Sequence, residues 1–149
     1  MYHYTESGLP NVYLRGGYIA RVIDGEEAVS IHDLNGLHKA IGQDIISRSP
    51  ALTGDEVRFL RKEMDLTQNS FANIIGVSED TVRNWENGRN GVGRPEDILI
   101  RGFYHETVND DSGLRKIIEN IARLNREIAE DERQMNFEET PDGLWQVAA

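Results

Sequence analysis

Between residues 51 and 108, apolar positions recur at the three- and four-residue steps that place side chains on one face of an α-helix. Four helices are predicted there, each with a recognisable start signal. The start signals, each given with the residues of its helix, are Thr53 with Val57, Leu60 and Met64; Thr67 with residues 68–75; Ser78 with residues 79–87; and Pro95 with Ile98, Leu99 and Phe103. The pattern predicts a bundle of about four helices over residues 51–108.

The first fifty residues carry a β-type pattern. Three short runs are rich in β-branched and aromatic residues: 11–15, 18–23 and 28–31. The tight-turn dipeptides Gly16-Gly17 and Asp24-Gly25 separate them. These runs predict a small antiparallel β-meander, which needs a covering helix or a partner to be stable.

A helix is predicted directly after the strands. Four apolar residues share one face of residues 33–48: Leu34, Leu37, Ile41 and Ile45. We expect this face to cover the sheet. Pro50 ends the helix and marks the predicted boundary of an N-terminal module, residues 1–50.

Residues 109–149 are predicted to form a helical tail and a C-terminal segment. Five apolar residues step by three, four, three and four positions: Leu114, Ile117, Ile121, Leu124 and Ile128. This spacing is typical of a short coiled-coil seam, so the helix either joins a dimer or packs against the protein's own domains. The last residues carry Phe137, Leu144, Trp145 and Val147 in an acidic setting, which favours an edge strand or a partner-binding segment.

The segment 68–87 meets four separate requirements of a helix-turn-helix. Ala72 is small enough for two helices to cross closely, and Gly76 stands where the connecting turn needs a positive φ. Val82 and Trp85 recur on the inner face of the second helix. The second helix is therefore predicted to be held against the first.

These residues resemble the phage Cro/repressor (Xre) class of helix-turn-helix proteins, over residues 52–108 and most closely in LTQNSFANIIGVSEDTVRNWENG. The resemblance implies a mainly α fold, a λ-repressor-like helical bundle behind a small α+β N-terminal part, and binding to double-stranded DNA. YTESGLPNVYL together with LTGDEVRFLRKEMDLTQ is similar to two-domain antitoxin-like regulators. Some of those bind zinc through paired cysteines, but this chain has no cysteine, so no metal site is carried over.

The resemblance also assigns residues to DNA. It turns Glu79, Asp80, Arg83 and Asn84 toward the major groove as base-reading residues. An acidic side chain there can accept from the N4 amine of cytosine, although it also repels phosphate. Alternatively, Glu79 and Asp80 only complement the positive end of the helix dipole, an effect of about 0.3–1 kcal/mol each.

Four residues are candidates for phosphate contacts: Gln68, Ser78, Arg89 and Arg94. Gln68 starts a helix, where its amide and the backbone N–H groups can both reach a phosphate. Arg61 and Glu86 match positions that pair in Xre domains, which implies a structural ion pair without base contact.

The charge of the chain argues against strong non-specific DNA binding. Its net charge is -10, divided into -2 over residues 1–50, -3 over 51–108 and -5 over 109–149. Half of the excess lies in the tail, while Arg83, Arg89 and Arg94 crowd the second motif helix and its loop. We therefore expect specific contacts to dominate.

No enzyme, cofactor or membrane association is predicted. The four histidines, His3, His32, His38 and His105, lack metal-ligand spacing, and no serine or cysteine stands in a nucleophile motif. The run GRNGVGRP follows no strand and precedes no Lys-Ser or Lys-Thr, so it is not a phosphate-binding loop. No apolar run reaches membrane-span length and no signal peptide is recognisable, which favours the cytoplasm.

Three functional classes are compatible with this pattern. The first is a sequence-specific repressor that binds a palindromic operator as a homodimer. The second is a type II antitoxin that neutralises a toxin by protein contacts and represses its own operon. The third is a protein-interaction module without DNA binding.

Overall fold

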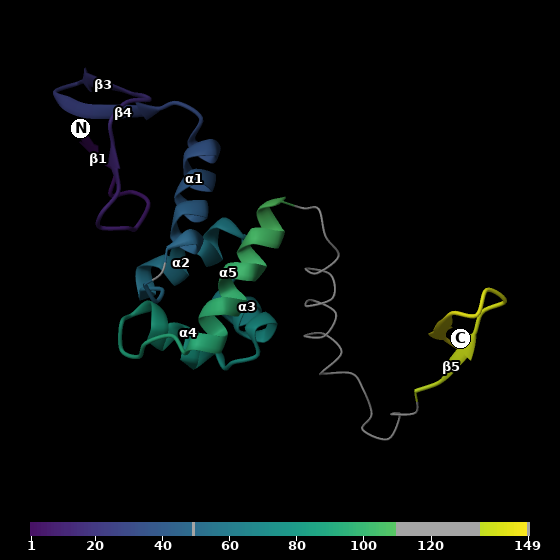
Figure 1. Cartoon of the computed structure of the whole chain (residues 1–149). Coiled ribbons are helices and arrows are strands. Elements are labelled where there is room, and N and C mark those ends of the chain that lie inside the picture. Colours follow the sequence, from purple (N-terminus) through teal and green to yellow (C-terminus); the bar gives the residue numbers. More distant parts are fainter. Residues whose placement is uncertain (49, 110–134, 149) are drawn as a thin grey trace.

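The computed structural model describes residues 1–48, 50–109 and 135–148, and five helices lie between short strands within them (Figure 1). The elements in chain order are β1 (Tyr2–His3), β2 (Tyr13–Leu14), β3 (Tyr18–Ile23), β4 (Glu26–Ile31), α1 (Leu34–Ser47), α2 (Gly54–Glu63), α3 (Gln68–Ile75), α4 (Glu79–Glu86), α5 (Arg94–Asn109), β5 (Phe137–Glu139) and β6 (Trp145–Val147). The fold is mainly α with small antiparallel sheets, which confirms the predicted class.

Helices α2 to α5 form the predicted bundle, and they begin where the sequence marks them. The side chains of Thr53, Thr67 and Ser78 each accept a hydrogen bond from the third N–H of the helix that they cap. The side chains with the least exposure fill the bundle core: Val57, Leu60, Phe71, Val82, Ile100, Phe103 and Tyr104. Ile98, which helped to predict α5, lies on the exposed side of that helix instead.

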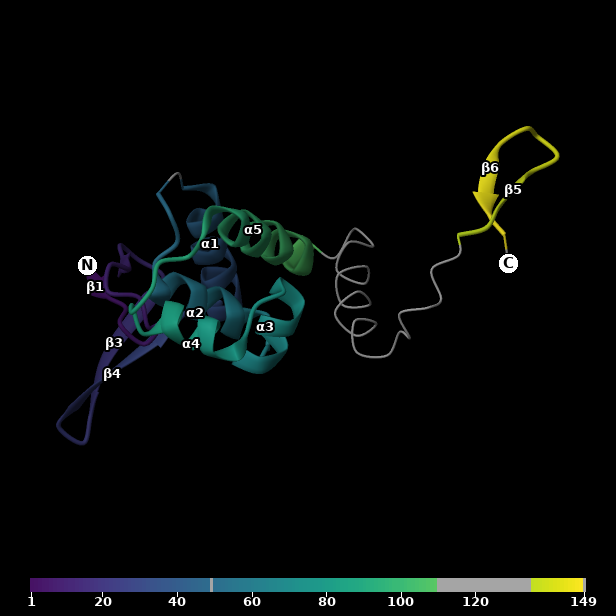
Figure 2. The same ribbon diagram turned by 90° about the horizontal axis from the view of Figure 1, so that it is seen from below.

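Helix α1 is present, but it packs mainly against α5 and α2 and not against the strands β3 and β4, and Figure 2 shows it beside α5. Its Leu37 and Ile41 line one hollow with Tyr13 and Leu14 of β2. Ile45 belongs to the same core as the bundle helices, whereas Leu34 at the other end of α1 is exposed. Because α1 shares this core, the packing continues across Pro50, and the division of the chain at residue 50 stays a prediction about domain organisation.

The three predicted strand runs do not form one meander. The residues of the first run pair with the extreme N-terminus, which the pattern did not identify as a strand: Tyr2 lies opposite Leu14 and His3 opposite Tyr13. The other two runs form a separate hairpin, β3–β4. Its turn is the predicted Asp24-Gly25, with φ of 52° and 82° as a type I′ turn requires.

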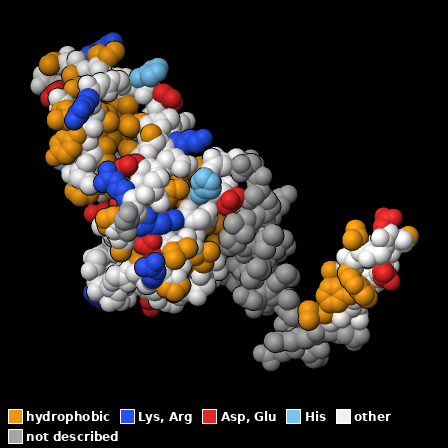
Figure 3. All heavy atoms as spheres, in the orientation of Figure 1, with side chains coloured by type: hydrophobic (Ala, Val, Ile, Leu, Met, Phe, Trp, Pro, Cys, Tyr) orange, Lys and Arg blue, Asp and Glu red, His pale blue; other side chains and the backbone are white. Residues whose placement is uncertain are grey.

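The hairpin β3–β4 carries exposed apolar side chains. Ile19, Val22 and Ile23 are all more than half exposed, and Figure 3 shows hydrophobic side chains gathered over this end of the molecule. A two-stranded sheet is only marginally stable alone. This hairpin therefore offers a surface on which another chain could pack.

The C-terminal segment contains a second hairpin, β5–β6. Phe137 lies opposite Val147 and Glu139 opposite Trp145, so these four side chains share one face. The predicted coiled-coil residues Leu114, Ile117, Ile121, Leu124 and Ile128 lie outside the described residues.

One buried polar atom in the bundle has no partner among the described residues, the hydroxyl of Tyr104. Burial and the negative charge of Glu63 raise the pKa of this hydroxyl to about 12. Since an unpaired buried hydroxyl costs its desolvation energy, Tyr104→Phe is expected to leave the free energy of unfolding unchanged or raise it by up to about 1 kcal/mol, measured by urea unfolding.

The matched control is Tyr4→Phe. The Tyr4 hydroxyl lies 2.7 Å from Nε2 of His38, so this variant loses a hydrogen bond that Tyr104 never makes. We expect it to lower the free energy of unfolding by about 1 kcal/mol. A larger loss for Tyr104→Phe than for Tyr4→Phe would show that the Tyr104 hydroxyl does have a partner in solution.

Candidate nucleic-acid interface

Helices α3 and α4 form a helix-turn-helix whose turn depends on Gly76. This residue caps α3 with φ of 88°, a conformation that side-chain-bearing residues rarely adopt, and its N–H donates to the Ala72 carbonyl at 2.9 Å. Val82 and Trp85 are buried against the bundle, as predicted from their spacing. The opposite side of α4 is therefore free to face a ligand.

The four predicted base-reading residues share that outer side. Asp80 and Arg83 are exposed, while Glu79 and Asn84 are partly exposed. Both acidic residues of the set pair with Arg83: its guanidinium donates to Asp80, and its Nη2 lies 3.6 Å from Oε1 of Glu79. The structure thus brings the predicted readers together, and it joins three of them to one another.

The predicted phosphate contacts fall into two groups. Arg89, in the loop after α4, and Arg94, the first residue of α5, are exposed, and neither guanidinium has a partner among the described residues. Gln68 and Ser78 have structural roles: Gln68 Nε2 donates to Glu86 at 3.3 Å, and Ser78 Oγ caps α4.

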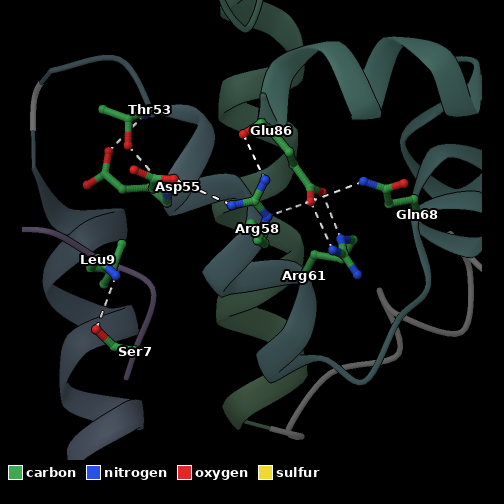
Figure 4. A network of polar contacts seen from close by, with 9 residues as sticks. Ser7, Leu9, Thr53, Asp55, Arg58, Arg61, Gln68 and Glu86 are labelled. Atoms are coloured by element: carbon green, nitrogen blue, oxygen red, sulfur yellow. Dashed lines mark hydrogen bonds and ion pairs between the residues drawn. The ribbon is translucent and has the colours of Figure 1, made fainter. Parts of the chain in front are cut away.

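A buried network fixes the C-terminal end of α4 (Figure 4). Glu86 Oε2 accepts from Arg61 Nε at 2.7 Å, and Oε1 accepts from Arg61 Nη2 at 2.9 Å, which makes the bidentate form of the implied ion pair. Oε1 also accepts from Gln68 Nε2 and Arg58 Nε, both at 3.3 Å. Four donors therefore surround one carboxylate and join α4 to α2 and α3.

The ionised form of Glu86 is favoured in this network. Burial alone would raise the pKa of its carboxyl group. The hydrogen bond and positive charge of Arg61 lower this pKa, as do the hydrogen bond of Gln68 and the charge of Arg58. The net result is a pKa below the ordinary glutamate value. Ionised Glu86 thus holds the second motif helix in place.

The sequence did not identify two of the residues that support the interface. Arg58 donates from Nη2 to the Glu86 carbonyl at 3.0 Å, closing the end of α4 against α2. Its position three residues before Arg61, on the same face of α2, is the signal that could have indicated this role. Asn69 on α3 donates to Glu79 at 3.3 Å, and no sequence pattern predicts that contact.

A second unpredicted set fastens the connection between α1 and α2. Asp97 Oδ2 accepts from the Leu52 N–H at 2.8 Å, and its Oδ1 accepts from Arg101 Nε at 2.6 Å. Arg101 also donates to backbone carbonyls of this connection, including Pro50 at 2.7 Å. The spacing of Asp97 and Arg101, four residues apart on α5, could have revealed the pair.

Within residues 1–48, 50–109 and 135–148, no three His, Cys, Asp or Glu side chains lie close enough together to hold a metal ion. None of the helices α1 to α5 has the length and apolar character needed to cross a membrane.

Comparisons with known proteins agree with this geometry. Residues 57–93, which cover most of α2, all of α3 and α4 and the loop after α4, match the family model for a helix-turn-helix. The chain is also 32% identical over 84 residues to antitoxin PezA of Streptococcus pneumoniae serotype 4, strain ATCC BAA-334 / TIGR4. That alignment covers 54% of this chain and 53% of the relative, so the chain spans about half of the length of PezA. No solved structure matches the chain significantly.

The family match and the observed turn agree on the same residues. The match begins at Val57 in α2 and ends in the loop after α4, which includes Gly76 and the buried pair of Arg61 and Glu86. Residues 57–93 of this chain form a helix-turn-helix of the Xre type, the DNA-binding class that the sequence predicted.

Proposed function

We propose that this protein is a transcriptional regulator, most simply a repressor of its own gene, that binds a palindromic operator as a homodimer through α4. The observation that supports it is the match of residues 57–93 to the helix-turn-helix family, together with a polar outer face of α4 that no described element covers. This role is regulatory and not enzymatic, and its site of action is the cytoplasm.

In this proposal α4 enters the major groove. Glu79, Asp80, Arg83 and Asn84 then face base edges, and the two subunits of the dimer read major grooves about one DNA turn apart. Arg89 and Arg94, whose guanidinium groups have no partner among the described residues, contact phosphates beside the groove. Gln68 and Ser78 supply the N-terminal ends of α3 and α4 for further phosphate contacts, which would require Gln68 to share its amide with Glu86.

The test is the double variant Arg83→Ala/Asn84→Ala. Both residues lie on the outer side of α4, so we expect an unchanged circular dichroism spectrum and melting temperature. We also expect the variant to lose its preference for the operator over random DNA, since bidentate base contacts carry that discrimination. The operator is first selected from a randomised duplex library with the full chain, and affinities are then measured by gel shift.

Arg94→Ala is the matched control for a residue that contacts only phosphate. It should weaken binding to operator and random DNA by similar factors, and it should make the slope of log affinity against log salt shallower by about one unit. Unchanged operator preference in Arg83→Ala/Asn84→Ala would remove α4 as the reading helix. Failure of the wild type to select any sequence would favour the protein-interaction module without DNA binding.

Two surfaces could form the homodimer in this proposal. One is the predicted seam from Leu114 to Ile128 in the tail, residues 109–149, which lies outside the described residues. The other is the hairpin β3–β4 in the N-terminal module, residues 1–50, with its exposed Ile19, Val22 and Ile23. Charge substitutions in each surface, assayed by sedimentation, distinguish them.

The similarity to PezA favours a second candidate, a type II antitoxin that binds a toxin and represses its own operon. In this case residues outside 51–108 bind the toxin, and the N-terminal module and the C-terminal segment are the available parts. A small open reading frame beside the gene, whose product co-purifies with this chain and is toxic alone, would support this candidate. The absence of any such neighbour would favour the simple repressor.

A further inference from the structure

The outer face of α4 carries its own counter-charges. Arg83 donates to Asp80, and its Nη2 lies 3.6 Å from Oε1 of Glu79. The other carboxylate oxygen of Glu79 accepts from Asn69 Nδ2 at 3.3 Å, so α3 also holds this group in position. In the protein without DNA, the guanidinium of Arg83 on α4 is therefore already paired with carboxylates.

These pairs are exposed and can be exchanged for other partners. The side chains of Arg83, Glu79 and Asp80 are 51%, 43% and 81% exposed. Ion pairs at such exposure contribute little to stability, unlike the pair of Arg61 and Glu86, in which the side chains are only 11% and 1% exposed. DNA can thus replace the intramolecular partners of Arg83 without disturbing the fold.

The same arrangement penalises binding to arbitrary DNA. Two carboxylates and one guanidinium leave the outer side of α4 with a net charge of -1, so it repels phosphate. Arg89 and Arg94, which have no partner among the described residues, follow the C-terminal end of α4 in the chain. Random DNA therefore gains little from the outer side of α4, whose side chains must find base edges that suit both signs of charge.

Base chemistry identifies which base pair suits both signs. Guanine presents two acceptors, O6 and N7, to a guanidinium, and cytosine presents the N4 amine to a carboxylate. Thymine offers the O4 acceptor and a methyl group, and adenine places the N7 acceptor beside its amine, so both disfavour a carboxylate. A G·C pair is the partner that accepts an arginine and an acidic residue side by side.

We propose that Glu79, Asp80 and Arg83 act as one charge-compensated reader that specifies a G·C pair in each half-site and lowers affinity for all other DNA. On the operator, Arg83 leaves its carboxylates and donates to guanine O6 and N7. The freed carboxylate of Glu79 or Asp80 then accepts from a cytosine N4 amine. This inference rests on the proposed function, because it requires α4 to lie in the major groove.

The test compares the wild type with Glu79→Gln/Asp80→Asn, each selected against a randomised duplex library as the full chain. Amides are weaker acceptors than carboxylates and also carry donors, so the cytosine of this G·C pair loses its partner while Arg83 still reads the guanine. Discrimination in favour of the G·C pair over other base pairs should fall by about 5- to 100-fold. Affinity for random DNA should rise, since two phosphate-repelling charges are gone.

Glu26→Gln/Glu27→Gln is the matched control, because it removes the same charge from the exposed hairpin β3–β4. It should leave both the selected sequence and the affinity for random DNA close to wild type. If the control raised affinity for random DNA equally, net charge and not the reader would explain the effect, and the proposal would be wrong.

Three outcomes separate this inference from the proposed function. A wild type that selects no sequence overturns both. A selected operator whose recognition is unchanged in Arg83→Ala/Asn84→Ala removes α4 as the reader, and the inference with it. The third outcome is an operator whose recognition depends on α4 but in which Glu79→Gln/Asp80→Asn changes the selection of no G·C pair. This outcome overturns the inference alone, and the proposed function as a regulator remains.

Discussion

Glu86→Gln is expected to lower the free energy of unfolding by about 3–5 kcal/mol, the usual cost of removing one member of a buried ion pair. The Glu86 side chain is 1% exposed and accepts from Arg61, Arg58 and Gln68. A neutral amide cannot compensate the Arg61 guanidinium, which is 11% exposed and has no second carboxylate among the described contacts. Urea unfolding monitored by circular dichroism measures the loss.

The control is Glu79→Gln, which breaks an ion pair of the same type on the same helix. Its partner Arg83 and Glu79 itself are about half exposed, so the change should stay within about 0.5 kcal/mol. Equal losses in the two variants would contradict the assignment of Glu86 as the carboxylate that fixes α4.

The effect of Glu86 also depends on pH. Because the pKa of Glu86 lies below the ordinary value of 4.5, folding favours the ionised form. The resulting stabilisation is complete above about pH 4.5 and is lost as the pH falls through the lower pKa of the folded state. The difference in unfolding free energy between wild type and Glu86→Gln should therefore shrink below pH 4.5, and a constant difference down to pH 2 would contradict this account.

Local signals in the sequence were sufficient for the helix-turn-helix. A cap such as Thr67 or Ser78 acts within one turn, and Gly76 permits a positive φ whatever surrounds it. The helices α3 and α4 therefore begin at the predicted residues. The pair of Arg61 and Glu86 lies 25 residues apart in the chain, and the family resemblance was needed to suggest it.

Pairing between segments was harder to predict. The runs that became β2 and β3 have equally good strand composition, yet β2 pairs with Tyr2 and His3, whose two residues are too short to show a period. Apolar periodicity placed α1 correctly but could not tell which element its face would contact. Likewise, the resemblance that predicted Arg83 to be a base reader did not indicate that Glu79 and Asp80 would pair with it in the free protein.

The contact between α1 and α5 leads to the last prediction, a loss of about 3 kcal/mol or more for Gly42→Ala. A Cβ atom on Gly42 would overlap the hydroxyl group and ring of Tyr104. The ring has no exposed area and cannot move aside into solvent, so α1 must move away from α5. This cost exceeds the gain of about 1 kcal/mol that alanine normally brings to a helix interior.

Gly102→Ala is the control, because Gly102 lies in α5 with nothing near the position of an added Cβ atom. It should raise the free energy of unfolding by about 0.5–1 kcal/mol. Gly42→Ala/Tyr104→Leu should recover part of the loss from Gly42→Ala, since leucine lacks the overlapping atoms. If residues 1–50 instead folded as an independent module, Gly42→Ala would separate α1 from an otherwise stable bundle. The unfolding transition of residues 51–108 would then keep its wild-type midpoint. If instead the whole protein unfolds in a single transition at a shifted midpoint, α1 is part of the same bundle as residues 51–108.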